Sequence, residues 1–141
     1  MPNEPNYTSP VMGRTIFLAE DDLDDQEFLA EALLEFDPSV RLKSFTSGVK
    51  FLENLEKTDD VLLPCLIVLD YNIPEINGAE ILRHLNKSSR YDHIVKIIWS
   101  TSNSDLFRKS CLDLGAKEYF IKPSNMAGIK RTAEMLLSYC D

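Results

Sequence analysis

Short apolar runs alternate along this chain with longer segments that have the spacing of helices. Runs of four to six residues, rich in branched and aromatic side chains, are typical of β-strands. A run that is apolar throughout indicates a strand buried on both faces, whereas alternation with polar residues indicates an edge strand with one exposed face. The predicted strands cover residues 14–19, 40–45, 66–69, 94–99 and 118–121, and the second of them alternates in this way.

The segments between the strands predict amphipathic helices with recognisable ends. The first begins near Leu23, and Pro38 ends it because proline cannot continue a helix. Its predicted buried side chains are Phe28, Leu29, Ala32, Leu33 and Phe36. Small or polar residues mark the ends of the other helices: Ser47, Asn77 with Glu80, Ser104 and Ser124 at their starts, and Gly115 after the fourth helix.

Strands that alternate with helices through short loops predict a single α/β domain. Parallel neighbouring strands need helical crossovers, so we expect a doubly wound parallel sheet of five strands with helices on both faces. A chain of 141 residues has room for one such core. Residues 1–13 contain three prolines and no apolar period, and we expect a flexible tail there, before a domain that spans residues 14–141.

Charge and hydropathy narrow the possible partners. The net charge of −8 disfavours direct binding of nucleic acid, which depends on clustered Lys and Arg. The longest apolar stretch, residues 61–69, contains Pro64 and is far too short to span a bilayer. Because residues 1–13 also lack the features of a secretory signal, we expect no membrane partner and a cytoplasmic location.

The cysteines predict neither a disulfide framework nor a zinc site. Cys65, Cys111 and Cys140 are odd in number, and no two of them have the spacing of a CxxC motif. We expect Cys65 and Cys111 to be small core residues.

Four of the five predicted strands end in side chains that can carry out chemistry: Glu20 with Asp21, Asp70, Ser100 and Lys122. The ligand site of a doubly wound sheet lies outside the carboxyl ends of its strands. A carboxylate at the end of a buried strand is poorly solvated and needs a positive partner. For Asp70, the sequence offers two such partners: a cation held by the acidic cluster Glu20-Asp21-Asp22, or the Lys122 ammonium.

These groups suit the transfer of a phosphoryl group to Asp70. Carboxylate oxygens such as those of Asp21 and Asp70, with a backbone carbonyl, are suitable ligands for Mg²⁺, which would neutralise Asp70 and an incoming phosphoryl oxygen together. Lys122 would bind a second phosphoryl oxygen, and the Ser100 hydroxyl would donate a hydrogen bond. We therefore expect Asp70 to act as a nucleophile that forms an aspartyl phosphate.

Two neighbouring features have simpler interpretations. Asp22, Asp24 and Asp25 lie at the start of a helix, where the helix dipole favours solvated negative charge, so we assign them no chemical role. Tyr119 is interpreted either as a packing residue of the last strand or as a residue that moves on phosphorylation.

Taken together, these motifs resemble the receiver domain of response regulators, the phospho-acceptor of two-component signalling, over residues 14–140. The resembling motifs are Glu20-Asp21, Asp70 followed by Tyr-Asn-Ile-Pro, Asn77-Gly78, Ser100-Thr101, and Tyr119 with Lys122-Pro123. The resemblance implies a flavodoxin-like sheet with strand order 2-1-3-4-5. It also implies Mg²⁺ bound by Asp21, Asp70 and the backbone carbonyl of Asn72, with Glu20 acting through water.

The resemblance further implies how the domain signals. Asp70 would receive its phosphoryl group from a sensor histidine kinase or a phosphotransfer protein, and Ser100 and Tyr119 would then move together. A stand-alone receiver of this kind is similar to those that serve phytochrome-type and other hybrid sensor kinases. It would signal to a separate protein, or to a second copy of itself, through residues 104–139, and would catalyse only its own phosphotransfer and dephosphorylation. A cis peptide bond before Pro123 is also expected.

Some positions depart from the commonest receiver pattern. Glu20 stands where Asp is commoner, and Ser100 stands where Thr is frequent. Trp99 is bulky for its place in the fourth strand.

Three other functions remain as alternatives. A phosphohydrolase of the haloacid-dehalogenase type also uses a strand-end Asp with Mg²⁺, but it needs an acid where this chain has Asn72. Its nucleophile also belongs on the first strand. A flavin-binding protein needs a glycine-rich phosphate loop after that strand, where Glu20-Asp21-Asp22 would repel the phosphate. A receiver-like adaptor that is never phosphorylated would be expected to lack an acceptor or clamp residue.

Overall fold

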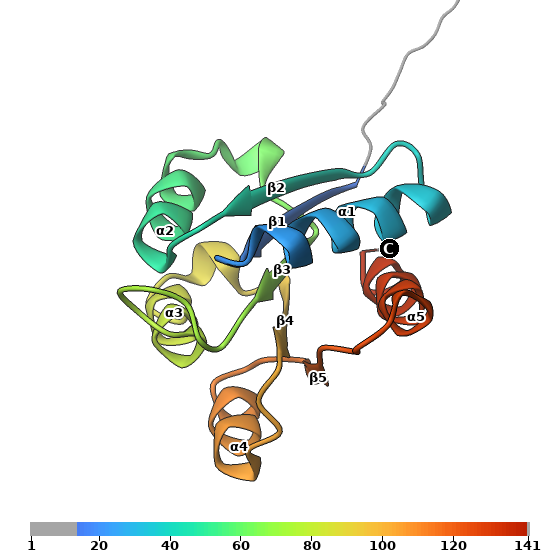
Figure 1. Cartoon of the computed structure of the whole chain (residues 1–141). Coiled ribbons are helices and arrows are strands. Elements are labelled where there is room, and N and C mark those ends of the chain that lie inside the picture. Colours follow the sequence, from blue (N-terminus) through green and yellow to red (C-terminus); the bar gives the residue numbers. More distant parts are fainter. Residues whose placement is uncertain (1–13, 141) are drawn as a thin grey trace, which may run out of the picture.

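The computed structural model describes residues 14–140, which form a five-stranded parallel sheet with helices on both faces (Figure 1). The strands are β1 (Thr15–Ala19), β2 (Arg41–Phe45), β3 (Leu66–Leu69), β4 (Val95–Ser100) and β5 (Glu118–Ile121). Their order in the sheet is β2-β1-β3-β4-β5, and every neighbouring pair is parallel. The predicted flavodoxin-like strand order is therefore confirmed. The tail expected over residues 1–13 lies outside the described residues.

The five predicted helices are present, with caps close to the expected positions. They are α1 (Leu23–Phe36), α2 (Gly48–Lys57), α3 (Gly78–Leu85), α4 (Asp105–Asp113) and α5 (Met126–Ser138). Ser47 and Ser104 cap α2 and α4, and Asn77 with Glu80 forms a full capping box on α3. The last helix begins two residues after Ser124, because the Asn125 side chain caps it by accepting the N–H of Gly128. Two 3-10 turns, η3 (Asp60–Leu62) and η4 (Ser89–Tyr91), lie in the loops before β3 and β4.

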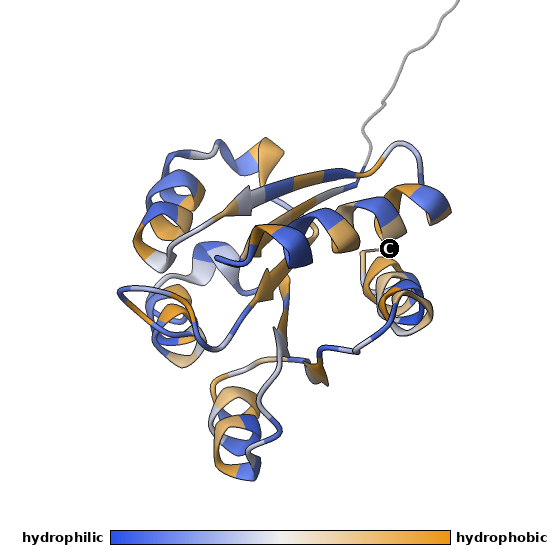
Figure 2. Cartoon of the chain, in the orientation of Figure 1, coloured by the Kyte–Doolittle hydropathy of each residue, from blue (hydrophilic) through white to orange (hydrophobic). Residues whose placement is uncertain are grey.

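The sheet separates two apolar layers. Alternate side chains of each strand point to opposite faces, as the pleat requires. On one face Ile16, Val68 and Trp99 pack against α1 and α5, and on the other Phe17, Leu69 and Ile98 pack against α2, α3 and α4. All four residues of β3 are fully buried. In Figure 2 the central strands are mostly orange, whereas each helix shows both hydrophilic and hydrophobic positions.

The predicted burial on α1 is correct only for its central stripe. Leu29, Ala32 and Leu33 are buried, but Phe28 is 42% exposed and Phe36 is 44% exposed. Leu29, Ala32 and Leu33 share one face of the helix, the face toward the sheet and α5. Phe28 lies beside this stripe and Phe36 is the last residue of the helix, so neither is covered.

The cysteine prediction is wrong for one pair. Cys65 and Cys140 form a disulfide whose Cα atoms are 5.1 Å apart, although 75 residues separate them in sequence. Cys65 directly precedes β3 and Cys140 follows α5, and the fold brings these two positions together at the amino ends of the strands, opposite Asp70. A count of cysteines does not reveal this. Cys111 is free and buried, as expected. Within residues 14–140, no helix combines the length and apolarity needed to cross a membrane.

Candidate functional site

The acidic side chains at the ends of β1 and β3 lie together because these strands are neighbours. Ala19 is aligned with Leu69, so Glu20 and Asp21 follow β1 beside the point where Asp70 follows β3. Carboxylate oxygens of Glu20, Asp21 and Asp70 all lie within 4.8 Å of one another. Glu20 and Asp70 are buried and Asp21 is exposed.

Lys122, which follows β5, reaches across the sheet into this acidic group. Its Nζ lies 2.5 Å from Glu20 Oε1, 2.9 Å from Asp25 Oδ2 and 3.3 Å from Asp70 Oδ2. The lysine side chain is only 8% exposed. Its ammonium also lies 5.0 Å from the centre of the Trp99 ring, at the distance of a cation–π contact. The site is thus a buried ammonium surrounded by carboxylates.

The pKa values of Glu20 and Lys122 are both raised at this site, for different physical reasons. Burial raises the pKa of the Glu20 carboxyl to about 7, although its ion pair with Lys122 lowers it. For Lys122, burial alone would lower the pKa, but hydrogen bonds to Glu20 and Asp25 and the charge of Asp70 raise it above the ordinary value. Lys122 is therefore charged at neutral pH.

The loop after β3 holds the Asp70 carboxylate against the backbone. The N–H of Asn72 donates to Asp70 Oδ1 at 3.3 Å, and the N–H of Gly78 donates to the Tyr71 carbonyl at 2.9 Å. A Cβ on Gly78 would lie 2.9 Å from the Asp70 carbonyl oxygen, which is closer than real Cβ atoms approach. Glu75 has a φ of 78°, the left-handed region that is uncommon for a residue with a side chain. The loop therefore packs tightly behind the nucleophile candidate.

Ser100 and Tyr119 both form hydrogen bonds with the backbone of the loop that follows β4. Ser100 is buried, its Oγ accepts the Ser102 N–H at 3.2 Å, and its carbonyl accepts the Lys122 N–H at 2.7 Å. Tyr119 is 3% exposed, and its hydroxyl donates to the Ser102 carbonyl at 2.9 Å. Both predicted switch residues are thus connected to Ser102.

The donor set fits a hard divalent cation. Glu20, Asp21 and Asp70 supply only oxygen, which Mg²⁺ prefers, and the exposed side of the cluster at Asp21 leaves room for water ligands. Asn72 contacts Asp70 through its N–H. The Asn72 carbonyl as a metal ligand and Glu20 acting through water stay predictions.

Asp25 is the site residue that the sequence interpretation missed. The other two aspartates of the first helical turn behave as interpreted: Asp22 caps α1 and Asp24 is exposed. Asp25, by contrast, points back to Lys122. Asp25 lies in the first turn of α1, which follows the strand-end residues Glu20 and Asp21, and nothing in its local pattern separates it from Asp24.

The prediction of a cis bond before Pro123 is wrong. Every peptide bond in the described part of the chain is trans. The trans form of an X-Pro bond is favoured by roughly 0.5–1 kcal/mol. With this bond trans, the Lys122 N–H donates to the Ser100 carbonyl at 2.7 Å and the Lys122 side chain reaches Asp70.

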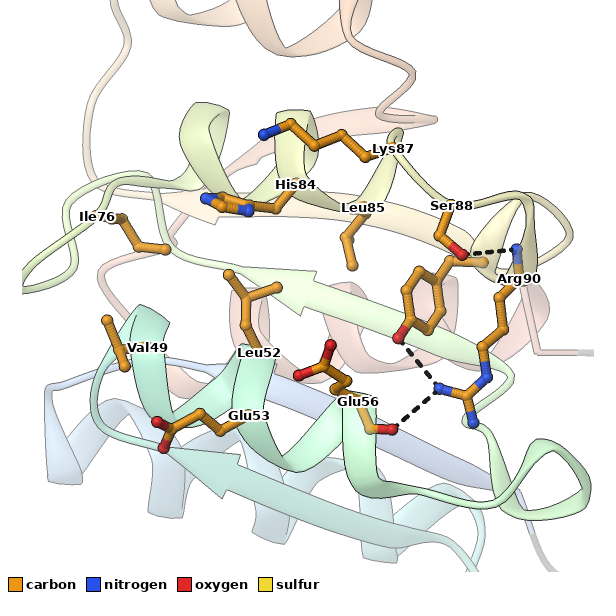
Figure 3. Close-up of a pocket in the computed structure, with 11 residues that line it drawn as sticks. Val49, Leu52, Glu53, Glu56, Ile76, His84, Leu85, Lys87, Ser88 and Arg90 are labelled. Atoms are coloured by element: carbon orange, nitrogen blue, oxygen red, sulfur yellow. Dashed lines mark hydrogen bonds between the residues drawn. The ribbon is translucent and has the colours of Figure 1, made fainter.

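Two depressions lie outside the acidic cluster. One of about 500 Å³ is bordered by Asp25, Phe28, Pro123 and Met126, between α1 and the start of α5. A larger one of about 720 Å³ lies between α2 and α3, with an apolar floor that includes Leu52 and Leu85 (Figure 3). Arg90 closes one end of it by donating to the Glu56 carbonyl and the Tyr91 hydroxyl. None of the residues that line it belongs to the cluster of Glu20, Asp21 and Asp70, so the strand ends remain the candidate site of chemistry.

The fold and the strand-end carboxylates with their lysine define a class, the doubly wound α/β proteins with an acidic pocket. Within that class, the family model of the response regulator receiver domain matches residues 16–134, and this chain belongs to that family. It is therefore a receiver domain of two-component signalling.

Relatives agree with this assignment. The two-component response regulator ORR13 of Oryza sativa subsp. japonica is 32% identical over 116 residues, which cover 82% of this chain and 92% of that protein. The structure is similar to that of the phosphorylated cyanobacterial phytochrome response regulator RcpA, with a TM-score of 0.80, 26% identity, and coverage of 89% of this chain and 95% of that one. A response regulator in red light signalling of R. palustris has a TM-score of 0.75 and 26% identity, over 86% of this chain and 90% of that one.

Proposed function

We propose that Asp70 accepts a phosphoryl group from a phosphohistidine on a sensor histidine kinase or a phosphotransfer protein, with Mg²⁺ bound beside it. The observation that carries this proposal is the cluster of Glu20, Asp21 and Asp70 within 4.8 Å, with the Lys122 ammonium 3.3 Å from Asp70. The domain is phosphorylated as a signal, and the only reactions it catalyses are its own phosphotransfer and dephosphorylation.

The step is a displacement at phosphorus. An oxygen of Asp70 forms the new bond to phosphorus while the bond from phosphorus to the imidazole nitrogen breaks, and that nitrogen keeps the electron pair. Lys122 binds one phosphoryl oxygen and the Ser100 hydroxyl donates to another, so the group is held in line with Asp70. Asp21, Asp70, the Asn72 carbonyl and, through water, Glu20 would hold Mg²⁺, which supplies positive charge to the phosphoryl oxygens.

The relatives support this reaction. RcpA, at 26% identity, is described in its phosphorylated form, and the plant relatives are described as two-component response regulators. The histidine kinase or phosphotransfer protein would contact the chain at the exposed side of the carboxylate cluster, where Asp21 lies.

The signal is proposed to leave through residues 104–139, the segment that contains α4, β5 and α5. This segment exposes apolar side chains: Leu106 is 71%, Leu112 41% and Ile121 38% exposed. A phosphoryl group adds about −1.5 to −2 charges beside Lys122 and Ser100, which end the two strands next to this surface. To convert the domain from mostly inactive to mostly active, the phosphoryl group must favour the active conformer by roughly 5 kcal/mol. The partner is a separate protein or a second copy of this chain.

Intact mass after incubation with acetyl phosphate tests the proposal. We expect the wild type to gain one phosphoryl group with Mg²⁺ and none without it. Asp70→Asn should gain none, and Asp21→Ala should need far more Mg²⁺, because the ion loses an anionic ligand. Asp59→Asn, which removes an exposed carboxylate elsewhere, is the matched control and should label as the wild type does. Stoichiometric labelling of Asp70→Asn would contradict the assignment.

A further inference from the structure

The three carboxylates around Lys122 are not equivalent. Glu20 and Asp70 belong to the oxygen cluster that can hold a cation, whereas Asp25 lies outside that cluster. Asp25 comes from the first turn of α1, and its side chain is 28% exposed. Lys122 therefore contacts two candidate metal ligands and one carboxylate with no place in the metal site.

The ammonium and a divalent cation would be held by two of the same carboxylates, Glu20 and Asp70. Lys122 Nζ lies 2.5 Å from Glu20 Oε1 and 3.3 Å from Asp70 Oδ2. A cation bound to these carboxylates would repel the ammonium, because the Lys122 side chain is buried and the repulsion is screened little by water. The repulsion favours movement of the ammonium away from Glu20 and Asp70 when the cation enters. A buried ammonium that withdraws needs another anionic partner, since an unpaired buried charge is costly.

We propose that Asp25 is a positioning residue that draws the Lys122 ammonium away from the metal carboxylates and holds it ready for a phosphoryl oxygen. Asp25 Oδ2 already lies 2.9 Å from Lys122 Nζ, so the lysine can give up its contacts with Glu20 and Asp70 without becoming unpaired. The lysine has three N–H donors. One stays on Asp25, and another becomes available for the incoming phosphoryl group.

The Trp99 ring limits where the lysine can go. The Lys122 ammonium lies 5.0 Å from the ring centre, and the ring is 1% exposed and fixed in the core between the sheet, α1 and α5. Asp25 and Trp99 are thus two contacts of the ammonium outside the metal cluster. This inference rests on the proposed function, because it assumes that a divalent cation occupies the carboxylate cluster.

The matched comparison is Asp25→Asn against Asp24→Asn. Both remove one negative charge from the first turn of α1, but Asp24 is exposed and, in the described structure, makes no ion pair with Lys122. Mg²⁺ affinity is measured by titration calorimetry on the full chain. We expect Asp25→Asn to weaken Mg²⁺ binding about fivefold or more, since the ammonium that moves away then meets a neutral amide oxygen instead of a carboxylate. Asp24→Asn should change it less than about twofold, as exposed charges are screened.

Two further variants separate positioning of the lysine from other effects. In a Lys122→Met background, the difference between Asp25→Asn and Asp24→Asn should disappear, because no ammonium remains to be drawn away. Asp25→Glu, which keeps the charge, should recover most of the wild-type affinity and serves if Asp25→Asn does not fold.

Each contrary result overturns the inference. It fails if Asp25→Asn and Asp24→Asn weaken binding equally, if their difference persists without Lys122, or if the wild type does not bind Mg²⁺. Wild-type protein that binds Mg²⁺ but gains no phosphoryl group from acetyl phosphate would instead overturn the proposed function, while the affinities still decide the role of Asp25.

Discussion

Tyr71 and Phe107 lie face to face, with ring centres 4.0 Å apart and ring planes 9° from parallel. Tyr71 directly follows Asp70, and Phe107 lies in the first turns of α4. The stack therefore joins the loop that carries the proposed phosphorylation site to the first helix of the proposed output surface. Stacked aromatic pairs contribute about 0.5–1.5 kcal/mol beyond the apolar area they bury.

Phe107→Leu should weaken communication between Asp70 and α4. It keeps an apolar side chain but removes the stacked ring, so α4 follows the position of Tyr71 less closely. With Mg²⁺ and beryllofluoride, a mimic of the phosphoryl group, the change in amide exchange over residues 104–113 should be smaller than in the wild type. Leu106→Ala, which alters the exposed neighbouring residue, is the control. An undiminished change in Phe107→Leu would rule out the stack as the link.

Gly78→Ala should disturb the carboxylate cluster. A Cβ at this position would lie 2.9 Å from the Asp70 carbonyl oxygen and 3.1 Å from the Tyr71 Cα, so the backbone that carries Asp70 must shift. We expect a loss of about 1–3 kcal/mol in the free energy of unfolding and weaker Mg²⁺ binding. Urea unfolding measures the free energy of unfolding, and titration calorimetry measures the Mg²⁺ affinity.

Gly115→Ala is the matched control for that experiment. Gly115 has a φ of 100°, and a Cβ there would lie 3.9 Å from Asn86 Oδ1, an ordinary contact, so alanine strains the backbone without a clash. It should cost about 1–2 kcal/mol of stability and leave Mg²⁺ affinity unchanged. Equal Mg²⁺ affinities in the two variants would show that Gly78 does not support Asp70.

Lys96→Met should stabilise the fold. Lys96 is 8% exposed, and its Nζ donates to the Tyr91 carbonyl at 2.5 Å without forming an ion pair among the described residues. Burial lowers the pKa of this ammonium below its ordinary value of 10.5. Because the charged form is disfavoured in the folded state, we expect the variant to gain about 1–2 kcal/mol at neutral pH. The Tyr91 carbonyl keeps the Ile94 N–H as a donor.

The pH dependence of that gain follows from the sign of the shift. Between the lowered folded pKa of Lys96 and 10.5, the unfolded chain binds more protons, so wild-type stability rises with pH in this window. The advantage of Lys96→Met over the wild type should therefore shrink as the pH approaches 10.5. Urea unfolding at several pH values measures it, with Lys117→Met as the exposed control. A variant less stable than the wild type at neutral pH would refute the argument.

Cys140→Ser should lower stability under oxidising conditions only. The disulfide from Cys65 to Cys140 closes a loop of 75 residues, and the chain-entropy model assigns such a cross-link about 4 kcal/mol. Thermal unfolding with and without a thiol reductant is the measurement. Cys65→Ser should behave identically, and the wild type should fall to the level of both variants when it is reduced. Unequal stabilities of the three reduced proteins would show that the serines act through packing.

The order of the secondary structure and the residues at the strand ends could be read from the sequence. Strand and helix periodicity, caps such as Ser47 and Asn77, and the positions of Asp70 and Lys122 are properties of short segments. A local pattern reports the backbone conformation and the side that faces the core, and these sufficed for the parallel sheet. Because parallel strands bring their carboxyl ends to one edge, they also sufficed to gather Glu20, Asp21, Asp70 and Lys122.

Other features depended on how elements far apart in the chain pack together. The ion pair of Asp25 with Lys122 joins residues 97 positions apart, and the disulfide joins the start of β3 to the end of α5. Phe28 is 42% exposed and borders a depression beside the start of α5. Such contacts are set by the positions of neighbouring helices to within an ångström or two, and ion pairs, disulfides and burial all change over that distance. The sequence therefore determined which groups meet at the carboxyl ends of the strands, and only the tertiary structure decided that Asp25 joins Glu20 and Asp70 around the lysine.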